Sequence, residues 1–99
     1  MSNVVEFASF HLKKGASVSE FLLVSDKFNS VFLEAQKGYI SRKLLHRDEM
    51  WADSVLWETM EDALKALQTA DDHSVACEYI SFMDEESIQV LHLTVERNY

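Results

Sequence analysis

The sequence predicts an α+β domain in which strands and helical regions follow one another as β-α-β-β-α-β. Three observations lead to this order. Two strand-like apolar runs each end shortly before a capping box, Ser17 with Glu20 and Thr59 with Asp62, and such boxes open helices. Apolar residues then recur at three- and four-residue steps, as on one face of a helix. A further strand-like run follows each helical region.

The first half of the chain predicts a strand, a long helix and a second strand. Residues 3–14 (NVVEFASFHLKK) are rich in residues that favour extended backbone, and Gly15 ends this run. The helix that Ser17 opens should close at Gly38, which is typical of a left-handed helix cap. Its apolar stripe consists of Phe21, Val24, Phe28, Val31, Phe32 and Ala35. Residues 39–47 (YISRKLLHR) form the second predicted strand.

The second half predicts a hairpin, a strand, a helical region and a last strand. Residues 48–53 (DEMWAD) are short and mostly polar, as a hairpin connection should be, and residues 54–58 (SVLWE) follow as the third strand. The helix that Thr59 opens carries Ala63, Leu64, Leu67 and Ala70, and a helical segment restarting at Asp72 or Ser74 carries Val75, Cys77, Tyr79 and Phe82. DEESIQ reads as a solvated loop, and residues 90–98 as the last strand.

This order of elements predicts one ferredoxin-like domain over residues 1–99. Right-handed connections place the four strands in a single antiparallel sheet with the helices on one face. A chain of 99 residues is the size of one domain.

Both faces of the predicted sheet carry large apolar side chains. In the first strand Val4, Glu6, Ala8, Phe10 and Leu12 share one face, and Val5, Phe7, Ser9 and His11 share the other. Strict alternation in the second strand places Ile40 with Leu44, and Tyr39 with Leu45. Two helices cover only one face, so we expect a homodimer in which the two sheets face each other.

Charge and cysteine content narrow the class of protein. A net charge of −8 repels phosphate backbones and anionic lipid surfaces, so we expect neither nucleic acid nor a membrane as partner. No apolar run approaches the roughly 20 residues that span a bilayer, and MSNVVEFASF lacks the features of a secretory signal. With Cys77 as the single cysteine, a cytoplasmic location is expected.

The chain resembles the dimeric α/β-barrel superfamily, in particular its antibiotic-biosynthesis-monooxygenase-like domains. The resemblance covers nearly the whole chain and rests on the order and spacing of FHLKKG, the long first helix, KGY before the second strand, and SVLWETMEDALKAL. It implies a homodimer with facing sheets and, in each subunit, a small-molecule pocket between sheet and helices. Members include cofactor-independent oxygenases, haem-degrading enzymes and many proteins of no known activity.

The haem-degrading branch of that superfamily uses an asparagine, a tryptophan and a histidine. Trp57 matches the tryptophan at the end of the third strand. Ala8 stands where the resemblance requires the asparagine, and His73 comes several residues later than the expected histidine. One match in three argues against haem degradation, and we predict no cofactor and no metal. The four histidines form no H-x-x-x-H pair.

We therefore predict a protein that binds an apolar small molecule, such as an aromatic polyketide or a fatty-acyl chain, between its helices and its sheet. The predicted ligand-binding residues are Ala8, Phe10, Phe28, Phe32, Trp57 and Tyr79. The alternatives are a cofactor-independent monooxygenase acting on a phenol or enol, and a ligand-free structural or regulatory dimer that binds a partner through DEESIQ or through the hairpin at Trp51. An exposed patch at Met50 and Trp51 would favour the ligand-free dimer.

Two residues are candidates for the base of a monooxygenase. Glu6 interrupts an apolar strand face, and a carboxyl that points inward has a raised pKa suited to taking a proton from a phenol. It points to solvent if it lies at a sheet edge. His73 is the second candidate, although its place after two aspartates also suits helix capping. His11, His46 and His92 lie on predicted strands and are expected at the surface or in the dimer interface.

Overall fold

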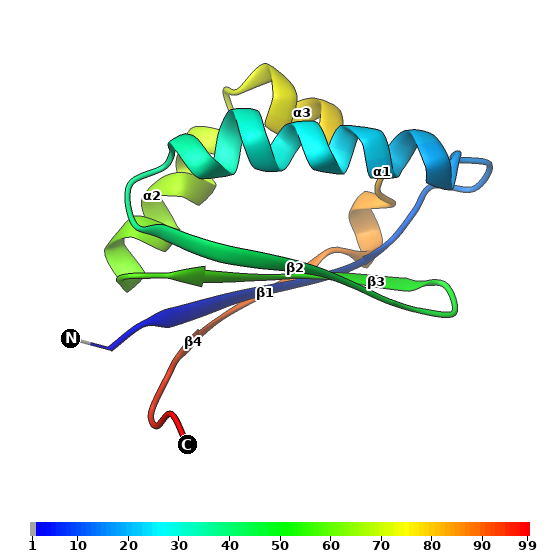
Figure 1. The fold of residues 1–99 in the computed structure, drawn as a ribbon. Helices are drawn as coiled ribbons and strands as arrows, with labels where there is room; N and C mark the ends of the chain where they lie inside the picture. The colour runs from blue at the N-terminus through cyan, green and yellow to red at the C-terminus, as the bar shows by residue number, and fades with distance from the viewer. Residues whose placement is uncertain (1) are drawn as a thin grey trace.

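A computed structural model describes residues 2–99 and has the predicted ferredoxin-like fold (Figure 1). The elements are β1 (Val4–His11), α1 (Val18–Lys27), η1 (Phe28–Phe32), η2 (Leu33–Ala35), β2 (Tyr39–Arg47), β3 (Met50–Trp57), α2 (Met60–Ala70), α3 (Ser74–Ile80), η3 (Glu85–Ser87) and β4 (Gln89–Thr94). The strands form one antiparallel sheet in the order β2-β3-β1-β4. The helices all lie on one side of the sheet, and the other side is uncovered in the single chain.

Ser17 and Thr59, the first residues of the predicted capping boxes, each cap a helix, and within residues 2–99 the reciprocal bond from Glu20 or Asp62 is not formed. The Ser17 hydroxyl accepts the backbone N–H of Glu20 at 3.2 Å, and the Thr59 hydroxyl accepts that of Asp62 at 3.0 Å. The first helical region is not uniform, because α1 passes into the π-helical turn η1 and then into the 3₁₀ turn η2. π-turns are rare and are found often at functional sites.

The third strand is longer than predicted. Residues 50–53 were assigned to the hairpin connection, whereas β3 begins at Met50 and pairs along its length with β1 and β2. The turn itself is confined to Asp48, with φ 53°, and Glu49. This extension turns Asp53 from an expected loop residue into a buried residue at the centre of the sheet.

The predicted faces of the second strand are wrong because β2 contains a bulge. The register with β3 shifts between Tyr39 and Ser41, so Tyr39 and Leu44 both face the helices although strict alternation separates them. Tyr39 packs edge-on against Trp57 at 6.1 Å between ring centroids. Ile40 is left 42% exposed.

Two smaller boundaries also differ. The predicted acidic loop contains the 3₁₀ turn η3, which Asp84 caps by accepting the backbone N–H of Glu86. The last strand covers residues 89–94 rather than 90–98, because pairing with β1 ends where β1 ends, at Val4 opposite Thr94.

The uncovered sheet face is apolar. It exposes Leu45 (43%), Leu91 (56%) and Leu93 (52%), while Val5, Phe7 and Leu56 are partly exposed between them.

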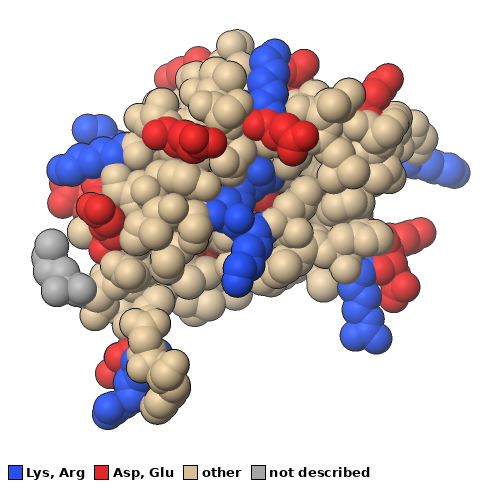
Figure 2. All heavy atoms as spheres, in the orientation of Figure 1, with Lys and Arg blue, Asp and Glu red and all other residues tan. Residues whose placement is uncertain are grey.

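On the face shown in Figure 2, acidic and basic side chains are interspersed, with uncharged surface between them. None of the helices within residues 2–99 has the length and apolar character that crossing a bilayer requires.

Candidate functional site

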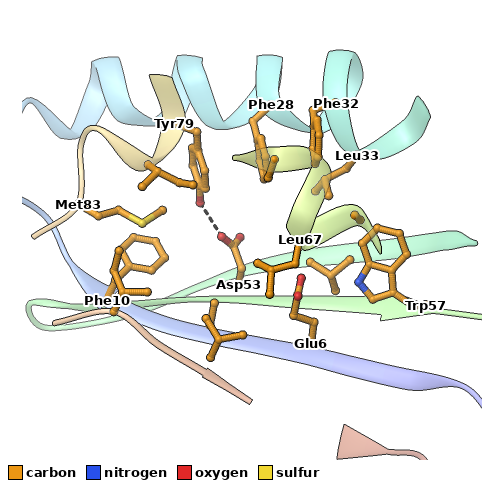
Figure 3. A pocket seen from close by; sticks show the side chains of 17 residues that line it. Glu6, Phe10, Phe28, Phe32, Leu33, Asp53, Trp57, Leu67, Tyr79 and Met83 are labelled. Carbon is orange, nitrogen blue, oxygen red and sulfur yellow. Dashed lines mark hydrogen bonds between the residues drawn. The ribbon is translucent and has the colours of Figure 1, made fainter. Parts of the chain in front are cut away.

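A cavity of about 150 Å³ lies between the helices and the sheet (Figure 3). It separates two parts of the core, one built around Trp57 and Phe32 and the other around Phe10, Phe21 and Tyr79. The residues that line it are Glu6, Ala8, Phe10, Phe28, Phe32, Leu33, Asp53, Val55, Trp57, Ala66, Leu67, Ala70, Tyr79, Ile80, Met83, Ile88 and Val90. Leu67 and Val90 are 43% and 39% exposed, so the cavity opens to solvent between α2 and the edge strand β4.

Seven of the eight residues proposed from the sequence lie on this lining. They are Glu6, Ala8, Phe10, Phe28, Phe32, Trp57 and Tyr79. The eighth, His73, is the N-cap of α3, where its Nδ1 accepts the backbone N–H of Val75 at 3.2 Å. Its ring packs against Phe32 from outside the cavity.

Small residues and stacked rings explain why the core leaves space here. Ala8 on β1 and Ala66 and Ala70 on α2 face the cavity with a single methyl group each. Elsewhere on the lining, the rings of Phe28 on η1 and Tyr79 on α3 stack almost parallel, with centroids 4.4 Å apart. The turn η1 also brings Phe28 parallel to Phe32, at 5.4 Å and 9°. Aromatic side chains held in stacks cannot turn inward to fill the space.

Trp57 is fully buried, and its indole Nε1 makes no hydrogen bond of ordinary geometry, although it lies close enough to the Glu6 carboxyl to lower the pKa of that group. Within residues 2–99 it is the only buried side-chain nitrogen or oxygen in this condition. Figure 3 shows the nitrogen on the side of the ring that faces Glu6. A buried donor without a partner costs about 1–3 kcal/mol. The cavity therefore offers one N–H that a ligand oxygen can accept.

Glu6 is the charged residue nearest to this donor. Its Oε2 lies 2.8 Å from Nε2 of His92, which faces it from β4. The two side chains are 15% and 16% exposed. Burial raises the pKa of Glu6 above its ordinary value, and Asp53 raises it further, while His92 and the indole of Trp57 oppose the rise. Glu6 points inward, and His92, expected at the surface or in the dimer interface, is its mostly buried partner.

A second polar group, Arg42 with Asp53 and Tyr79, forms part of the cavity wall. Arg42 Nε donates to Asp53 Oδ1 at 2.7 Å, and the Tyr79 hydroxyl donates to Asp53 Oδ2 at 2.7 Å. Arg42 also donates to the Tyr79 oxygen at 2.9 Å and to the Ser25 hydroxyl at 2.8 Å. Both oxygens of Asp53 are therefore occupied, so this group fixes the wall and leaves Trp57 and Glu6 as the free polar groups.

The three linked groups shift one another's pKa. Burial raises the pKa of Asp53, and the Arg42 guanidinium and the Tyr79 hydroxyl oppose that rise. For Tyr79, burial and the adjacent carboxylate raise the pKa far above its ordinary value, so the hydroxyl remains a donor. For Arg42, burial lowers the pKa, but Asp53 and Tyr79 outweigh it and the pKa is raised.

Sequence reasoning missed Arg42, Asp53 and His92. The sequence places Asp53 in the hairpin connection and His92 on a strand at the surface or in the dimer interface, and it predicts no role for Arg42 beyond a place on the second strand. One signal was available: Arg42 and Asp53 lie eleven positions apart across a hairpin, so an antiparallel pairing brings opposite charges together.

The burial of Trp51 bears on the ligand-free alternative, which an exposed patch at Met50 and Trp51 would favour. Trp51 is 9% exposed and packs edge-on against Phe21, with ring centroids 5.1 Å apart. His46 covers its other side at 4.2 Å. Met50 alone of the pair is exposed, at 46%, so the patch that would favour a ligand-free dimer is not formed.

The lining does not fit a haem. A volume of about 150 Å³ accommodates a benzene-sized molecule rather than a macrocycle. Within the described residues no histidine or cysteine lines the cavity, and the Tyr79 hydroxyl is already bonded to Asp53 and Arg42. Residues 2–99 also contain no group of three or more His, Cys, Asp or Glu side chains arranged to hold a metal ion.

Comparisons with known proteins match the fold. No protein-family model and no curated protein sequence matches the chain. Among solved structures, a variant of SnoaB, a cofactor-independent oxygenase from Streptomyces nogalater, superposes with a TM-score of 0.79 at 15% identity, over 99% of this chain and 97% of that one. A proposed antibiotic biosynthesis monooxygenase from Bordetella bronchiseptica gives 0.76 at 21% identity, over 100% and 99%.

A variant of MhuD, whose structure holds two manganese protoporphyrin IX molecules per active site, is a third match. It gives a TM-score of 0.67 at 14% identity, over 97% of each chain. All three identities are low, so these matches establish the fold of the chain and nothing about its activity. The chain has the fold of the antibiotic-biosynthesis-monooxygenase-like proteins, as its sequence resemblance implied.

Proposed function

We propose that this protein binds an apolar small molecule with one aromatic ring or a similar group inside the cavity beside Trp57. The unpartnered indole N–H carries the proposal, because a fully buried donor in an otherwise apolar cavity is satisfied when a ligand supplies an oxygen atom. Neighbours of the same fold include an oxygenase and a porphyrin-binding protein, which supports a small-molecule role.

The size of the cavity limits which part of a ligand is enclosed. A cavity of this volume takes a molecule of about the size of benzene. A longer ligand, such as an aromatic polyketide or a fatty-acyl chain, has to extend through the opening beside Leu67 and Val90. Both residues are apolar, so the opening suits an apolar extension.

Filling the cavity tests the proposal. Ala66→Leu places three more carbon atoms against the cavity, and Ala35→Leu adds the same atoms at an exposed position on η2. Native mass spectrometry and thermal shift with toluene and indole should show binding to the wild type and to Ala35→Leu but not to Ala66→Leu. Circular dichroism checks that both variants fold. Equal binding by all three proteins would place the ligand elsewhere and refute the proposal.

We further infer that a second copy of the chain covers the open sheet face. Leu91 and Leu93 are more than half exposed there, and contiguous apolar surface of this kind marks an interface. Light scattering should give twice the chain mass of 11.4 kDa. Leu91→Glu should reduce it to a single chain, while Leu23→Glu, at a 70% exposed position on α1, should not. A wild type that stays monomeric at micromolar concentration would refute the dimer.

A cofactor-independent monooxygenase is the second candidate, and Glu6 favours it. A carboxyl with a raised pKa on the wall of an apolar cavity is suited to accept the proton of a phenol or enol. The resulting anion is the reductant and molecular oxygen the oxidant, so the protein supplies a base, orientation and a dry cavity.

Oxygen uptake with anthrone-like and quinol substrates tests the enzyme. Glu6→Gln should reduce the rate roughly 10²–10⁴-fold, the usual contribution of a general base. His73→Ala should change it little, because His73 caps α3 outside the cavity. Uptake no faster than in buffer with every substrate would leave the binding protein as the better account.

A further inference from the structure

His92 connects the cavity with the edge of the sheet. It lies on β4, the outermost strand on that side, and pairs with Glu6 across the β1–β4 register. Glu6 lines the cavity, whereas His92 does not. His92 therefore acts on a ligand in the cavity indirectly, through its hydrogen bond to the Glu6 carboxylate.

The contact engages one carboxylate oxygen and leaves the other available. Nε2 of His92 lies 2.8 Å from Oε2 of Glu6. Among residues 2–99, no hydrogen bond of ordinary geometry engages Oε1, and the indole of Trp57 is the other group close enough to lower the Glu6 pKa by hydrogen bonding. An ionised Glu6 offers only acceptors, so Nε2 of His92 carries the hydrogen in this pair. This contact ties one carboxylate oxygen to β4.

We propose that His92 is a positioning residue that holds Glu6 so that its free oxygen accepts the hydroxyl hydrogen of a ligand whose own oxygen accepts the indole N–H of Trp57. This inference rests on the proposed ligand cavity and names the ligand chemistry: a hydroxyl group attached directly to an aromatic ring or an enol carbon. Such a hydroxyl is both donor and acceptor, which matches one free carboxylate oxygen beside one free N–H.

The surroundings leave His92 as the main partner of Glu6. Asp53 on β3 repels the Glu6 carboxylate, but both of its oxygens are engaged by Arg42 of β2 and Tyr79 of α3. The residues of α2 that line the cavity are Ala66, Leu67 and Ala70, which carry no charge. No other titratable side chain lines the cavity within the described chain. Replacing His92 should therefore change the titration of Glu6 directly.

Phenol and toluene form a matched pair of probes, because they differ in a hydroxyl against a methyl group. The wild type should bind phenol better than toluene by calorimetry. His92→Leu should weaken phenol about tenfold, the effect of one hydrogen bond to a charged group, and leave toluene unchanged. His92→Gln should restore the preference, since its amide N–H can reach the same oxygen. His11→Leu, at an exposed position on β1, is the control.

The titration of Glu6 provides a readout that a purely structural role would not change. Carbon NMR of the Glu6 carboxyl without ligand should give a higher midpoint in His92→Leu than in the wild type, because the hydrogen bond and charge of His92 both lower its pKa. As the pH is lowered, any phenol preference that remains in His92→Leu should disappear at a higher pH than in the wild type, because Glu6 becomes protonated earlier.

The outcomes separate this inference from the proposed function. If both probes bind the wild type and His92→Leu keeps its phenol preference and its Glu6 midpoint, the cavity stands and the role of His92 is overturned. If neither probe binds the wild type, the proposed cavity function fails, and the role of His92 toward a ligand fails with it.

Discussion

Removing the guanidinium of Arg42 should be among the most damaging single substitutions in this chain. Arg42→Met keeps most of the side-chain length but leaves Asp53, whose side chain is 9% exposed, without its counter-charge. Five hydrogen bonds are lost with the guanidinium: one to Asp53, one to Tyr79, two to Ser25 and one to Asn29. Breaking a buried ion pair from one side costs about 3–5 kcal/mol.

An exposed ion pair in the same protein provides the control. Lys27 and Glu78 join α1 to α3 at 3.2 Å, but their side chains are 53% and 46% exposed. Pairs of that kind contribute about 0–1 kcal/mol. Urea unfolding at one fixed protein concentration should therefore show a loss several times larger for Arg42→Met than for Lys27→Met. A dimer requires the fixed concentration, because its stability depends on it.

The pH dependence supplies an independent check. Arg42 lowers the pKa of Asp53, so its removal moves the folded-state pKa further above that of the unfolded chain. A carboxyl with a raised folded pKa stabilises the fold when protonated, and that contribution is lost as the pH rises. The deficit of Arg42→Met should be smaller in acid than at neutral pH. An Arg42→Met deficit that matches Lys27→Met, or that does not depend on pH, would refute this account of the network.

Three further predictions concern stability. In urea unfolding, Gly38→Ala should lower the free energy of unfolding more than Gly15→Ala does. Both glycines have φ near +84°, but a methyl group at Gly38 would overlap the Asp62 side chain, whereas Gly15 has open space. Equal losses of stability in the two variants would contradict this. Glu6→Gln should stabilise the protein at neutral pH and lose this advantage in acid, because a raised folded pKa makes the ionised form of Glu6 unfavourable; a thermal-unfolding series across pH checks the sign. Phe21→Ala should cost about 3–5 kcal/mol and Leu23→Ala under about 0.5, since Phe21 is fully buried and Leu23 is 70% exposed; similar values would argue against the packing around Phe21.

The parts of the fold that local chemistry specifies were predictable from the sequence. The helix N-caps at Ser17 and Thr59 and the left-handed glycine at Gly38 are short-range signals, and the structure has each of them. Residues 39–47 form a strand with the predicted boundaries. The register shift after Tyr39 left no such signal, because a bulge depends on how the partner strand pairs.

The cavity was predictable in place but not in its polar chemistry. The family resemblance implied a pocket between sheet and helices, and the many aromatic residues and the tryptophan at a strand end were consistent with an aromatic-lined cavity there. Charged residues are usually exposed, so nothing in the sequence singled out Arg42, Asp53 or His92 as part of a buried site. Their burial becomes favourable only through partners supplied by other strands and helices, and no local pattern shows those partners.

The contrast between the two polar groups explains where a ligand would be recognised. Asp53 shares its oxygens with Arg42 and Tyr79, so that group is complete within the protein and its role is to hold the stacked rings on one wall. In Trp57 and Glu6, one N–H and one carboxylate oxygen make no hydrogen bond of ordinary geometry to residues 2–99, and both side chains line the cavity. A fold that satisfies one buried polar group fully and leaves its neighbour unsatisfied loses stability at the second place alone. A ligand with a hydroxyl group can bond to both groups and should bind more tightly than one without it, so thermal stability should rise more with phenol than with toluene at equal ligand concentration.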